Sequence, residues 1–365
     1  MRKTVHVDLG PSSYDVVIEP GLLAQLGKLA SDAVGGAGSA IVVTESNVAP
    51  LYGPRALETL RSAGLSVTLI EFPAGEEHKT LSTAGHLFDM LFAALPPVDR
   101  DTLVVALGGG VTGDMAGFVA AIALRGLRWI QCPTTLLADV DASVGGKTAV
   151  DHPAGKNLIG AFHQPRGVFI DIATLATLPS REMQSGLAEC VKHAIIRDAS
   201  LLAFIEQNAS AILAFDLDVL TELVARNVAI KAAVVSADVR EMGQRAHLNF
   251  GHTVGHAIET LAGYGGMSHG QAVALGMICA CDMARSRKLI DESLCTRLRN
   301  VLQELGLSVT HADLDATAVW KLMQHDKKTR GGKVRMVLPT GLGQVDIFAD
   351  VTQQEVQQAL AAIAD

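Results

Sequence analysis

Three histidines and one glutamate in this sequence have the types and spacing that can hold a metal ion. His252 and His256 lie four residues apart, so on a helix their imidazoles share one face. His269 follows a glycine-rich turn that can fold it back toward them, and Glu189 offers a carboxylate from a second helical segment. Two histidines and a carboxylate with one open position are typical of catalytic zinc. A histidine pair alone is more often structural, so the third histidine and the acid are what favour a metal site.

A second candidate site is the glycine-rich sequence Gly108-Gly-Gly-Val-Thr-Gly113, which follows a predicted strand and opens a predicted helix. It satisfies G-x-G-x-x-G, a turn that brings backbone N–H groups to a dinucleotide pyrophosphate at a helix N-terminus. The acidic residue that usually follows about 20 positions later is missing. Glu45, after an earlier predicted strand, is a candidate for the ribose hydroxyls instead. A tight turn without a ligand is the alternative interpretation.

Basic side chains gather near both candidate sites. The sequence Asp141-Ala-Ser-Val-Gly-Gly-Lys147-Thr148 is not a P-loop, because Asp141 stands where the first glycine is required. It still presents Lys147 from a glycine-rich turn, and Lys156 and Asn157 follow closely, which suits an anionic or polyhydroxylated ligand. Further cations are Lys192, Lys231, Arg240, Arg245, Lys327 and Lys328. Together they predict a ligand with more than one negative group.

The elements that must position these residues change character along the chain. Predicted strands at residues 40–44, 66–70, 102–107, 129–131 and 167–170 alternate with helical patterns such as 51–63 and 80–95. This alternation predicts a mostly parallel sheet covered on both faces. Residues 180 to about 325 are helical in pattern, and a β-like segment at 333–338 precedes a last helix from Thr352. We expect an α/β dinucleotide-binding domain at 1–179 and a mainly α-helical metal-binding domain at 180–365.

Composition limits the classes of protein to consider. The chain has 365 residues, 49% of them hydrophobic and 19% charged, which predicts two domains with large interiors and a subunit interface. A net charge of −8 argues against nucleic acid as a partner. The five cysteines are scattered without a C-x-x-C pair and are expected to be buried thiols. No apolar run reaches membrane-spanning length and no apolar leader is visible, so we expect a cytoplasmic protein.

Seven motifs resemble those of one family, the 3-dehydroquinate synthases, in which they recur in the same order. They are Gly108-Gly-Gly-Val-Thr-Gly-Asp114, Pro133-Thr-Thr135, Asp141-Ala-Ser-Val-Gly-Gly-Lys-Thr148, Gly155-Lys-Asn157, Gly186-Leu-Ala-Glu-Cys-Val-Lys192, Leu248-Asn-Phe-Gly-His-Thr-Val-Gly-His256 and Asp326-Lys-Lys328. The resemblance covers nearly the whole chain. It implies an NAD-binding α/β domain, a helical metal-binding domain and a homodimer.

The resemblance also implies roles for individual residues. The implied zinc ligands, with Co²⁺ as a possible substitute, are Glu189, His252 and His269, which makes His256 a substrate contact. The implied NAD-binding positions are Glu45, Ala74, Gly75, Glu76, Glu77, His78, Lys79, Gly110, Val111, Thr112, Gly113, Asp114, Thr134, Thr135, Asp141, Lys147, Lys156, Thr174, Leu175, Ala176 and Thr177. The implied substrate-binding positions are Arg125, Lys147, Asn157, Lys192, Lys231, Arg245, Asn249, His256, Lys327 and Lys328. Ala74 and His78 depart from the family, where an Asp and a Tyr are common.

The implied reaction converts 3-deoxy-D-arabino-heptulosonate 7-phosphate (DAHP) to 3-dehydroquinate and phosphate, in the shikimate route to aromatic amino acids. NAD⁺ oxidises a ring hydroxyl transiently, phosphate is eliminated, the ketone is reduced again, and the ring opens and closes by an aldol step. Catalysis is expected to need closure of the two domains. One alternative is a metal-dependent polyol dehydrogenase of the same architecture, which would need no cluster of cations. Another sugar phosphate cyclase and a non-catalytic binding module are the remaining alternatives.

Overall fold

The computed structural model describes residues 1–240, 243–263, 266–312, 314–325 and 334–364, which fall into two compact units. The first unit comprises Met1–Leu178 and Leu220–Val239, and the second comprises Pro179–Val219 and Arg240–Asp365. The expected boundary after residue 179 lies within one residue of the first division. The return of Leu220–Val239 to the first unit was not expected from the sequence. Two ion pairs hold this segment there, Glu222 with Lys3 at 2.8 Å and Lys231 with Asp141 at 2.5 Å.

The first unit is built on a seven-stranded sheet. In spatial order the strands are β1 (Lys3–Val7), β2 (Tyr14–Ile18), β9 (Val168–Ile170), β6 (Arg128–Pro133), β5 (Leu103–Gly108), β3 (Ser39–Glu45) and β4 (Ser66–Phe72). All neighbouring strands pair in parallel except β1 and β2, which form an antiparallel hairpin. The five strands predicted from apolar runs are confirmed. β2 was missed, because it belongs to a hairpin outside the strand–helix alternation.

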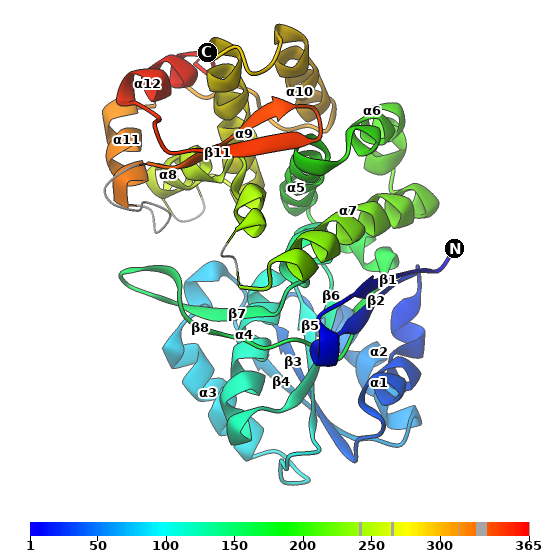
Figure 1. Ribbon diagram of the computed structural model, residues 1–365. Helices are drawn as coiled ribbons and strands as arrows, with labels where there is room; N and C mark the ends of the chain where they lie inside the picture. The colour runs from blue at the N-terminus through cyan, green and yellow to red at the C-terminus, as the bar shows by residue number, and fades with distance from the viewer. Residues whose placement is uncertain (241–242, 264–265, 313, 326–333, 365) are drawn as a thin grey trace. The chain divides into compact units, whose positions relative to one another are not determined.

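Helices cover both faces of this sheet, as expected for an α/β fold (Figure 1). Apolar residues of α1 (Leu26–Val34) and α2 (Ala49–Ser62) pack with one set of strand residues, including Val42 and Val105. Those of α3 (Leu81–Phe92) and α4 (Gly110–Ile122) pack with the alternate set, including Val43 and Val104. Successive strand residues face opposite sides, so the continuous apolar runs in the sequence are explained by burial on both faces.

Two further elements complete the first unit. An antiparallel hairpin of β7 (Lys147–His152) and β8 (Gly155–Phe162) forms a separate two-stranded sheet, where the sequence suggested only a glycine-rich turn. Helix α7 (Leu217–Ala237) contributes its residues from Leu220 onward. The hairpin and α7 carry several predicted site residues, among them Lys147, Asn157 and Lys231.

The second unit is mainly helical, which confirms the predicted fold class. Its helices are α5 (Ser180–Arg197), α6 (Ala199–Leu213), α8 (His252–Ala262), α9 (His269–Ser286), α10 (Glu292–Glu304), α11 (Ala316–His325) and α12 (Gln353–Ala361). A hairpin of β10 (Met336–Gly341) and β11 (Gln344–Phe348) precedes α12. The predicted start of the last helix is correct, because Thr352 and Glu355 form a capping box there.

Helices α8 and α9 approach each other so closely that glycine is required at their contact. A Cβ on Gly276 of α9 would lie 1.9 Å from the carbonyl oxygen of Gly251, and one on Gly255 of α8 would lie 2.9 Å from that of Ala272. These atoms belong to the backbone and cannot rotate away. The close contact matters because His252 and His269 begin these two helices.

We expect Gly276→Ala to lower the free energy of unfolding by about 1–3 kcal/mol, the usual cost of overpacking a core. The helices must separate to admit the methyl group. Chemical denaturation measures the loss, and Gly85→Ala in α3, whose added Cβ meets nothing within 4 Å, is the matched control. Equal stability of the Gly276 variant and the wild type would contradict the required close packing.

The prediction that the cysteines are buried thiols is confirmed. All five cysteines are buried free thiols. Burial raises the pKa of the Cys279 thiol to about 12, which keeps it protonated and unreactive. Among the described residues, no helix has both the length and the apolar character needed to cross a bilayer.

Candidate active site

Glu189, His252 and His269 come together in the second unit. Glu189 lies in α5, while the two histidines are the first residues of α8 and α9. The Nε2 atoms of His252 and His269 lie 3.6 Å and 3.9 Å from Oε1 of Glu189. The ligand atoms of all three residues lie within 4.8 Å of one another. Three nitrogen and oxygen donors at this separation can hold one ion and leave a position open.

Both imidazoles in this group have their other ring nitrogen engaged. Nδ1 of His252 lies 3.0 Å from the carbonyl oxygen of Phe250, and Nδ1 of His269 lies 3.1 Å from Oε2 of Glu259. Both partners are acceptors, so the hydrogen-bond pattern assigns the proton to Nδ1 and leaves a lone pair on Nε2. This is the tautomer that a histidine needs to bind a metal through Nε2.

The burial of Glu189 provides an independent test of whether a metal fits. Its side chain is 1% exposed, and the ammonium group of Lys192 lies against one carboxylate oxygen. Neither oxygen accepts a hydrogen bond of normal geometry from any residue that the structure describes. Buried carboxylate oxygens in this condition are rare, because an unsatisfied buried charge is costly. A divalent cation between Glu189 and the two Nε2 atoms would satisfy them, so these residues fit the predicted metal.

His256 lies beside this group. Its ring centroid is 5.3 Å from that of His252 and 5.9 Å from that of His269. The group of ligand atoms consists of Glu189 and the other two histidines. The four-residue spacing of the histidines therefore located the correct face of α8 but did not identify the ligand set.

Two cations of the second unit are almost completely buried. Lys192 is 1% exposed and Arg245 is 2% exposed. Arg245 and the half-buried Asn249 lie in a 3₁₀ helix, Gln244–Asn249, that leads into α8. Lys and Arg side chains are rarely buried to this degree unless they are paired. Lys192 and Arg245 are therefore not ordinary solvated surface charges. Lys327 and Lys328 lie outside the described residues.

In the first unit, the predicted cofactor residues follow the carboxyl ends of five strands. Glu45 ends β3, residues 74–79 follow β4, residues 110–114 follow β5, Thr134 and Thr135 follow β6, and residues 174–177 follow β9. These strands are parallel, so their carboxyl ends lie along the same edge of the sheet. Open parallel sheets bind their ligands at this edge. The sheet therefore brings together residues that are up to 132 positions apart in sequence, from Glu45 to Thr177.

The turn after β5 has the geometry expected of a nucleotide-binding loop. Gly108 has φ 158°, and a Cβ there would lie 2.4 Å from Oγ1 of Thr112. Its carbonyl oxygen accepts a hydrogen bond from the backbone N–H of Thr134 at 3.0 Å. The hydroxyls of Thr112 and Thr44 are buried and have no hydrogen-bond partner among the described residues. Thr44 is not among the predicted residues, although a polar residue near the end of a buried strand is a visible signal in the sequence.

Lys79 joins three of the predicted positions in one network. Its Nζ lies 2.6 Å from Oδ2 of Asp114, 2.6 Å from Oδ1 of Asn157 and 3.9 Å from Oε1 of Glu76. Burial lowers the pKa of Lys79, but the charges of Asp114 and Glu76 outweigh this effect and the pKa lies above its usual value. Lys79 is therefore charged at neutral pH. Lys156 reaches the same Glu76 oxygen from a distance of 3.9 Å.

Asn157 is held in a left-handed conformation, with φ 54°. The carboxylate of Asp151 accepts a hydrogen bond from its backbone N–H at 2.7 Å. The N–H of Asp151 in turn donates to the carbonyl oxygen of Lys79 at 2.7 Å. Asp151 is not among the predicted residues, and its position in the Asp-His-Pro turn is the signal that the sequence offered. This residue connects the β7–β8 hairpin to the segment after β4.

Lys231 reaches its partner from the returning helix α7. Its Nζ lies 2.5 Å from Oδ1 of Asp141, which sits in a π-helical turn, Ala138–Ala142, before β7. Short π-helical segments are rare and are frequent at functional sites. Lys147, at the start of β7, is exposed.

Hydrogen bonds also fix two other predicted regions, residues 174–177 and Glu45. The hydroxyl of Tyr52 in α2 lies 3.0 Å from the carbonyl oxygen of Thr174 and 2.6 Å from the hydroxyl of Thr177. The carboxylate of Glu45 accepts a hydrogen bond from the N–H of Asn47 at 2.8 Å. These hydrogen bonds orient both segments at the carboxyl edge of the sheet.

Within the first unit, Arg125 lies apart from the predicted residues at the carboxyl edge of the sheet. It follows α4, whose 13 residues span about 20 Å at 1.5 Å per residue. The helix starts at the carboxyl edge of the sheet, so Arg125 lies at the opposite edge, next to the start of β6. It is exposed and has a left-handed backbone with φ 67°.

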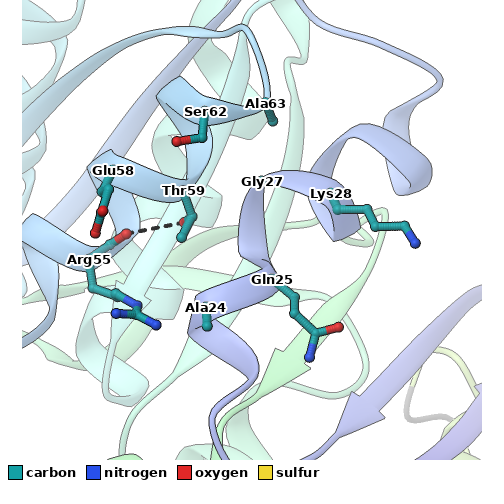
Figure 2. A pocket seen from close by; sticks show the side chains of 9 residues that line it. All are labelled: Ala24, Gln25, Gly27, Lys28, Arg55, Glu58, Thr59, Ser62 and Ala63. Atoms are coloured by element: carbon teal, nitrogen blue, oxygen red, sulfur yellow. Dashed lines mark hydrogen bonds between the residues drawn. The ribbon is translucent and has the colours of Figure 1, made fainter.

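Figure 2 shows a surface pocket between α2 and the start of α1 with the segment before it. Its volume is about 440 Å³. It is lined by Ala24, Gln25, Gly27, Lys28, Arg55, Glu58, Thr59, Ser62 and Ala63. None of these is a predicted site residue, and its charged side chains are exposed and of mixed sign. The pocket is therefore not part of the candidate site, which consists of the metal-binding and cofactor-binding candidates described above.

Comparisons with known proteins identify relatives that match residues of both units. Residues 69–185 match the family description "3-dehydroquinate synthase N-terminal", and residues 186–329 match "3-dehydroquinate synthase C-terminal". The chain is 48% identical to the 3-dehydroquinate synthase of Desulforamulus reducens, over 98% of this chain and 99% of that protein.

Two solved structures are similar over 98% of this chain. One is the 2-epi-5-epi-valiolone synthase ValA of Streptomyces hygroscopicus subsp. jinggangensis with NAD⁺ and Zn²⁺, with a TM-score of 0.88 and 30% identity over 98% of that chain. The other is 2-deoxy-scyllo-inosose synthase with carbaglucose-6-phosphate, NAD⁺ and Co²⁺, with a TM-score of 0.87 and 29% identity over 99% of that chain. The predicted resemblance is confirmed, and the chain belongs to the 3-dehydroquinate synthase family.

Proposed function

We propose that this chain is a 3-dehydroquinate synthase that converts DAHP to 3-dehydroquinate and inorganic phosphate with NAD⁺ and a divalent metal, zinc or cobalt. The observation that carries the proposal is the group of Glu189, His252 and His269, in a chain 48% identical over nearly its whole length to a protein of that name. The five buried free thiols support a reducing compartment, the cytoplasm.

Different residues would bind the two cofactors, NAD⁺ and the metal. When bound, NAD⁺ supplies reversible hydride transfer and the metal polarises the oxygen on the carbon that is oxidised. Glu189, His252 and His269 would hold the metal, and the residues at the carboxyl edge of the sheet would hold NAD⁺. The N-terminus of α4 and the charged Lys79 both suit the negative pyrophosphate.

The basic residues would bind the two anionic groups of DAHP. Candidate positions are Lys147, Asn157 and Lys231 in the first unit and Lys192, Arg245, Asn249 and His256 in the second. Guanidinium and ammonium groups bind carboxylate and phosphate with charge-assisted hydrogen bonds, which fixes a single conformer of the substrate. A polyol dehydrogenase has no use for such a set, so the cations favour a phosphorylated acid.

The direct test is incubation of the purified protein with DAHP, Zn²⁺ and NAD⁺, the last at about one hundredth of the DAHP concentration. We expect phosphate and 3-dehydroquinate to form in equal amounts until DAHP is exhausted, without accumulation of NADH. NADH accumulating from a simple polyol, with no phosphate released from DAHP, would favour the dehydrogenase alternative. Turnover that stops after one equivalent of NAD⁺ would overturn the proposed regeneration of the cofactor.

Arg245→Ala is expected to weaken DAHP binding at least about tenfold while leaving NAD⁺ binding nearly unchanged. A hydrogen bond to a charged group contributes about 1.5–3 kcal/mol, and the forked guanidinium suits the substrate carboxylate. Binding of both ligands is measured by calorimetry, with glucose 6-phosphate as a phosphate ester without a carboxylate. Arg181→Ala, at an exposed position in the first turn of α5, is the matched control. Equal weakening of DAHP and NAD⁺ would make the role of Arg245 structural.

A homodimer would give Arg125 a role that its own chain does not provide. Arg125 lies about 20 Å from the Gly108 turn, so in the dimer it would contact the substrate of the second copy. Mixing inactive Arg125→Ala protein with inactive Glu189→Gln protein should then restore activity, because one mixed site has both residues intact. Absence of restoration in a mixture shown to exchange subunits would contradict this arrangement.

A further inference from the structure

The second nitrogen of His269 is bound differently from that of His252. His252 has a neutral backbone acceptor, the carbonyl oxygen of Phe250 at 3.0 Å. His269 has the carboxylate of Glu259, whose Oε2 lies 3.1 Å from Nδ1. The Glu259 side chain is 18% exposed, so this charge is only partly screened by water. The Nδ1 atom of His269 therefore has a charged side chain as its acceptor.

The position of Glu259 follows from the geometry of α8. Residues 252, 256 and 259 are separated by four and three positions, so they share one face of the helix. His252 begins that face and Glu259 lies about two turns later. His269 starts the next helix, α9, after the connection from α8. The face that supplies His252 to the candidate metal group thus also supplies the partner of His269.

The ring orientation of His269 depends more on its hydrogen-bond partner than that of His252 does. Its side chain is 31% exposed, whereas that of His252 is 12% exposed. A less buried ring is less restrained by packing, and its orientation depends more on its hydrogen bond. The Nε2 atoms of both rings approach the same oxygen of Glu189, so a rotation of either ring would separate the ligand atoms.

We propose that Glu259 is a positioning residue that fixes the Nδ1–H tautomer and the ring orientation of His269 and increases its affinity for the metal. The inference rests on the proposed metal site of Glu189, His252 and His269. Carboxylates in this position orient metal-binding histidines and make them more basic, and their loss typically lowers metal affinity about 10–100-fold. Glu259 is outside the candidate ligand group of Glu189, His252 and His269, so in this role it acts through His269.

The test compares Glu259→Ala and Glu259→Gln with the wild type by competition for Zn²⁺ against a chelating dye. We expect Glu259→Ala to bind zinc about 10–100-fold more weakly. Glu259→Gln keeps an acceptor for Nδ1–H but loses the charge, so its affinity should fall between the two. With Co²⁺ in place of zinc, the visible absorption bands should shift in Glu259→Ala, and less in Glu259→Gln. Thr260→Ala, whose hydroxyl donates to the carbonyl oxygen of His256 at 2.7 Å, is the neighbouring control and should match the wild type.

The melting temperature of each metal-free variant separates positioning from general destabilisation. We expect the metal-free Glu259→Gln protein to melt as the wild type does, so any loss of affinity reflects the site. Zinc affinity and a Co²⁺ spectrum equal to wild type in both Glu259 variants would overturn the inference. If Glu189→Gln also binds zinc as tightly as wild type, the proposed metal site itself fails. Weakening in Glu189→Gln alone overturns only the role of Glu259.

Discussion

Glu189→Gln and His252→Ala should each lose most of their bound zinc and nearly all activity. Each change removes one of the three proposed metal ligands, whose ligand atoms lie within 4.8 Å of one another. Loss of an outer hydrogen-bond partner already lowers metal affinity or activity by about 10–100-fold, so loss of a direct ligand should exceed about 100-fold. Metal content by elemental analysis and the rate of phosphate release measure the two effects.

The amide at position 189 keeps the volume of the carboxylate, which limits damage to the buried surroundings. Glu182→Gln, at an exposed position in the first turn of the same helix, is the matched control and should retain its zinc and activity. Full zinc occupancy in both ligand variants would mean that the metal is held elsewhere.

Lys79→Met should lower the free energy of unfolding by about 3 kcal/mol, because it leaves the partly buried carboxylate of Asp114 without its cation. Lys79 is 4% exposed, and its Nζ lies 2.6 Å from that carboxylate. Methionine preserves most of the packing volume. Urea denaturation of wild type and variant measures the difference, and Asp114→Asn in the Lys79→Met background should recover part of it.

The pH dependence of this difference has a defined sign. The charges of Asp114 and Glu76 raise the pKa of Lys79 above its usual value of about 10.5 in the folded protein. Its charge therefore contributes full stability below about pH 10.5, and the contribution is lost as the pH rises through the folded pKa. Lys156→Met is the control, because Lys156 is exposed and its contact with Glu76 is long, at 3.9 Å, so its effect should stay within about 0.5 kcal/mol. An equally small effect of Lys79→Met would show that water reaches Asp114 freely.

Local periodicity explains why much of the fold could be predicted. The apolar runs of β3 and β5 are buried on both faces, so they are continuous in sequence as well as in structure. His252 and His256 share a helical face because their spacing matches the helical period. The turn at Gly108 could be predicted because only glycine fits its positive φ and its contact with Thr112.

The features that were missed depend on contacts between distant segments. Lys79 and Asn157 are 78 residues apart, and their hydrogen bond has no local sequence signal. The meeting of Glu189 with His252 and His269 joins three separate helices, and the helical spacing of His252 and His256 does not show it. The location of Arg125 follows from the direction of α4 across the sheet, which requires the topology. Hydrophobic periodicity carries no information on these relationships.

The return of Leu220–Val239 to the first unit has a consequence for synthesis and for engineering. The last segment of the first unit leaves the ribosome about 60 residues after Leu178, a delay of several seconds at about 5–20 residues per second. During this time the N-terminal 178 residues lack the last segment of their unit, while residues 179–219 of the second unit are synthesised. A gene cut once after residue 179 would yield no complete first unit. Exchange of units between family members needs three junctions, after residues 178, 219 and 239.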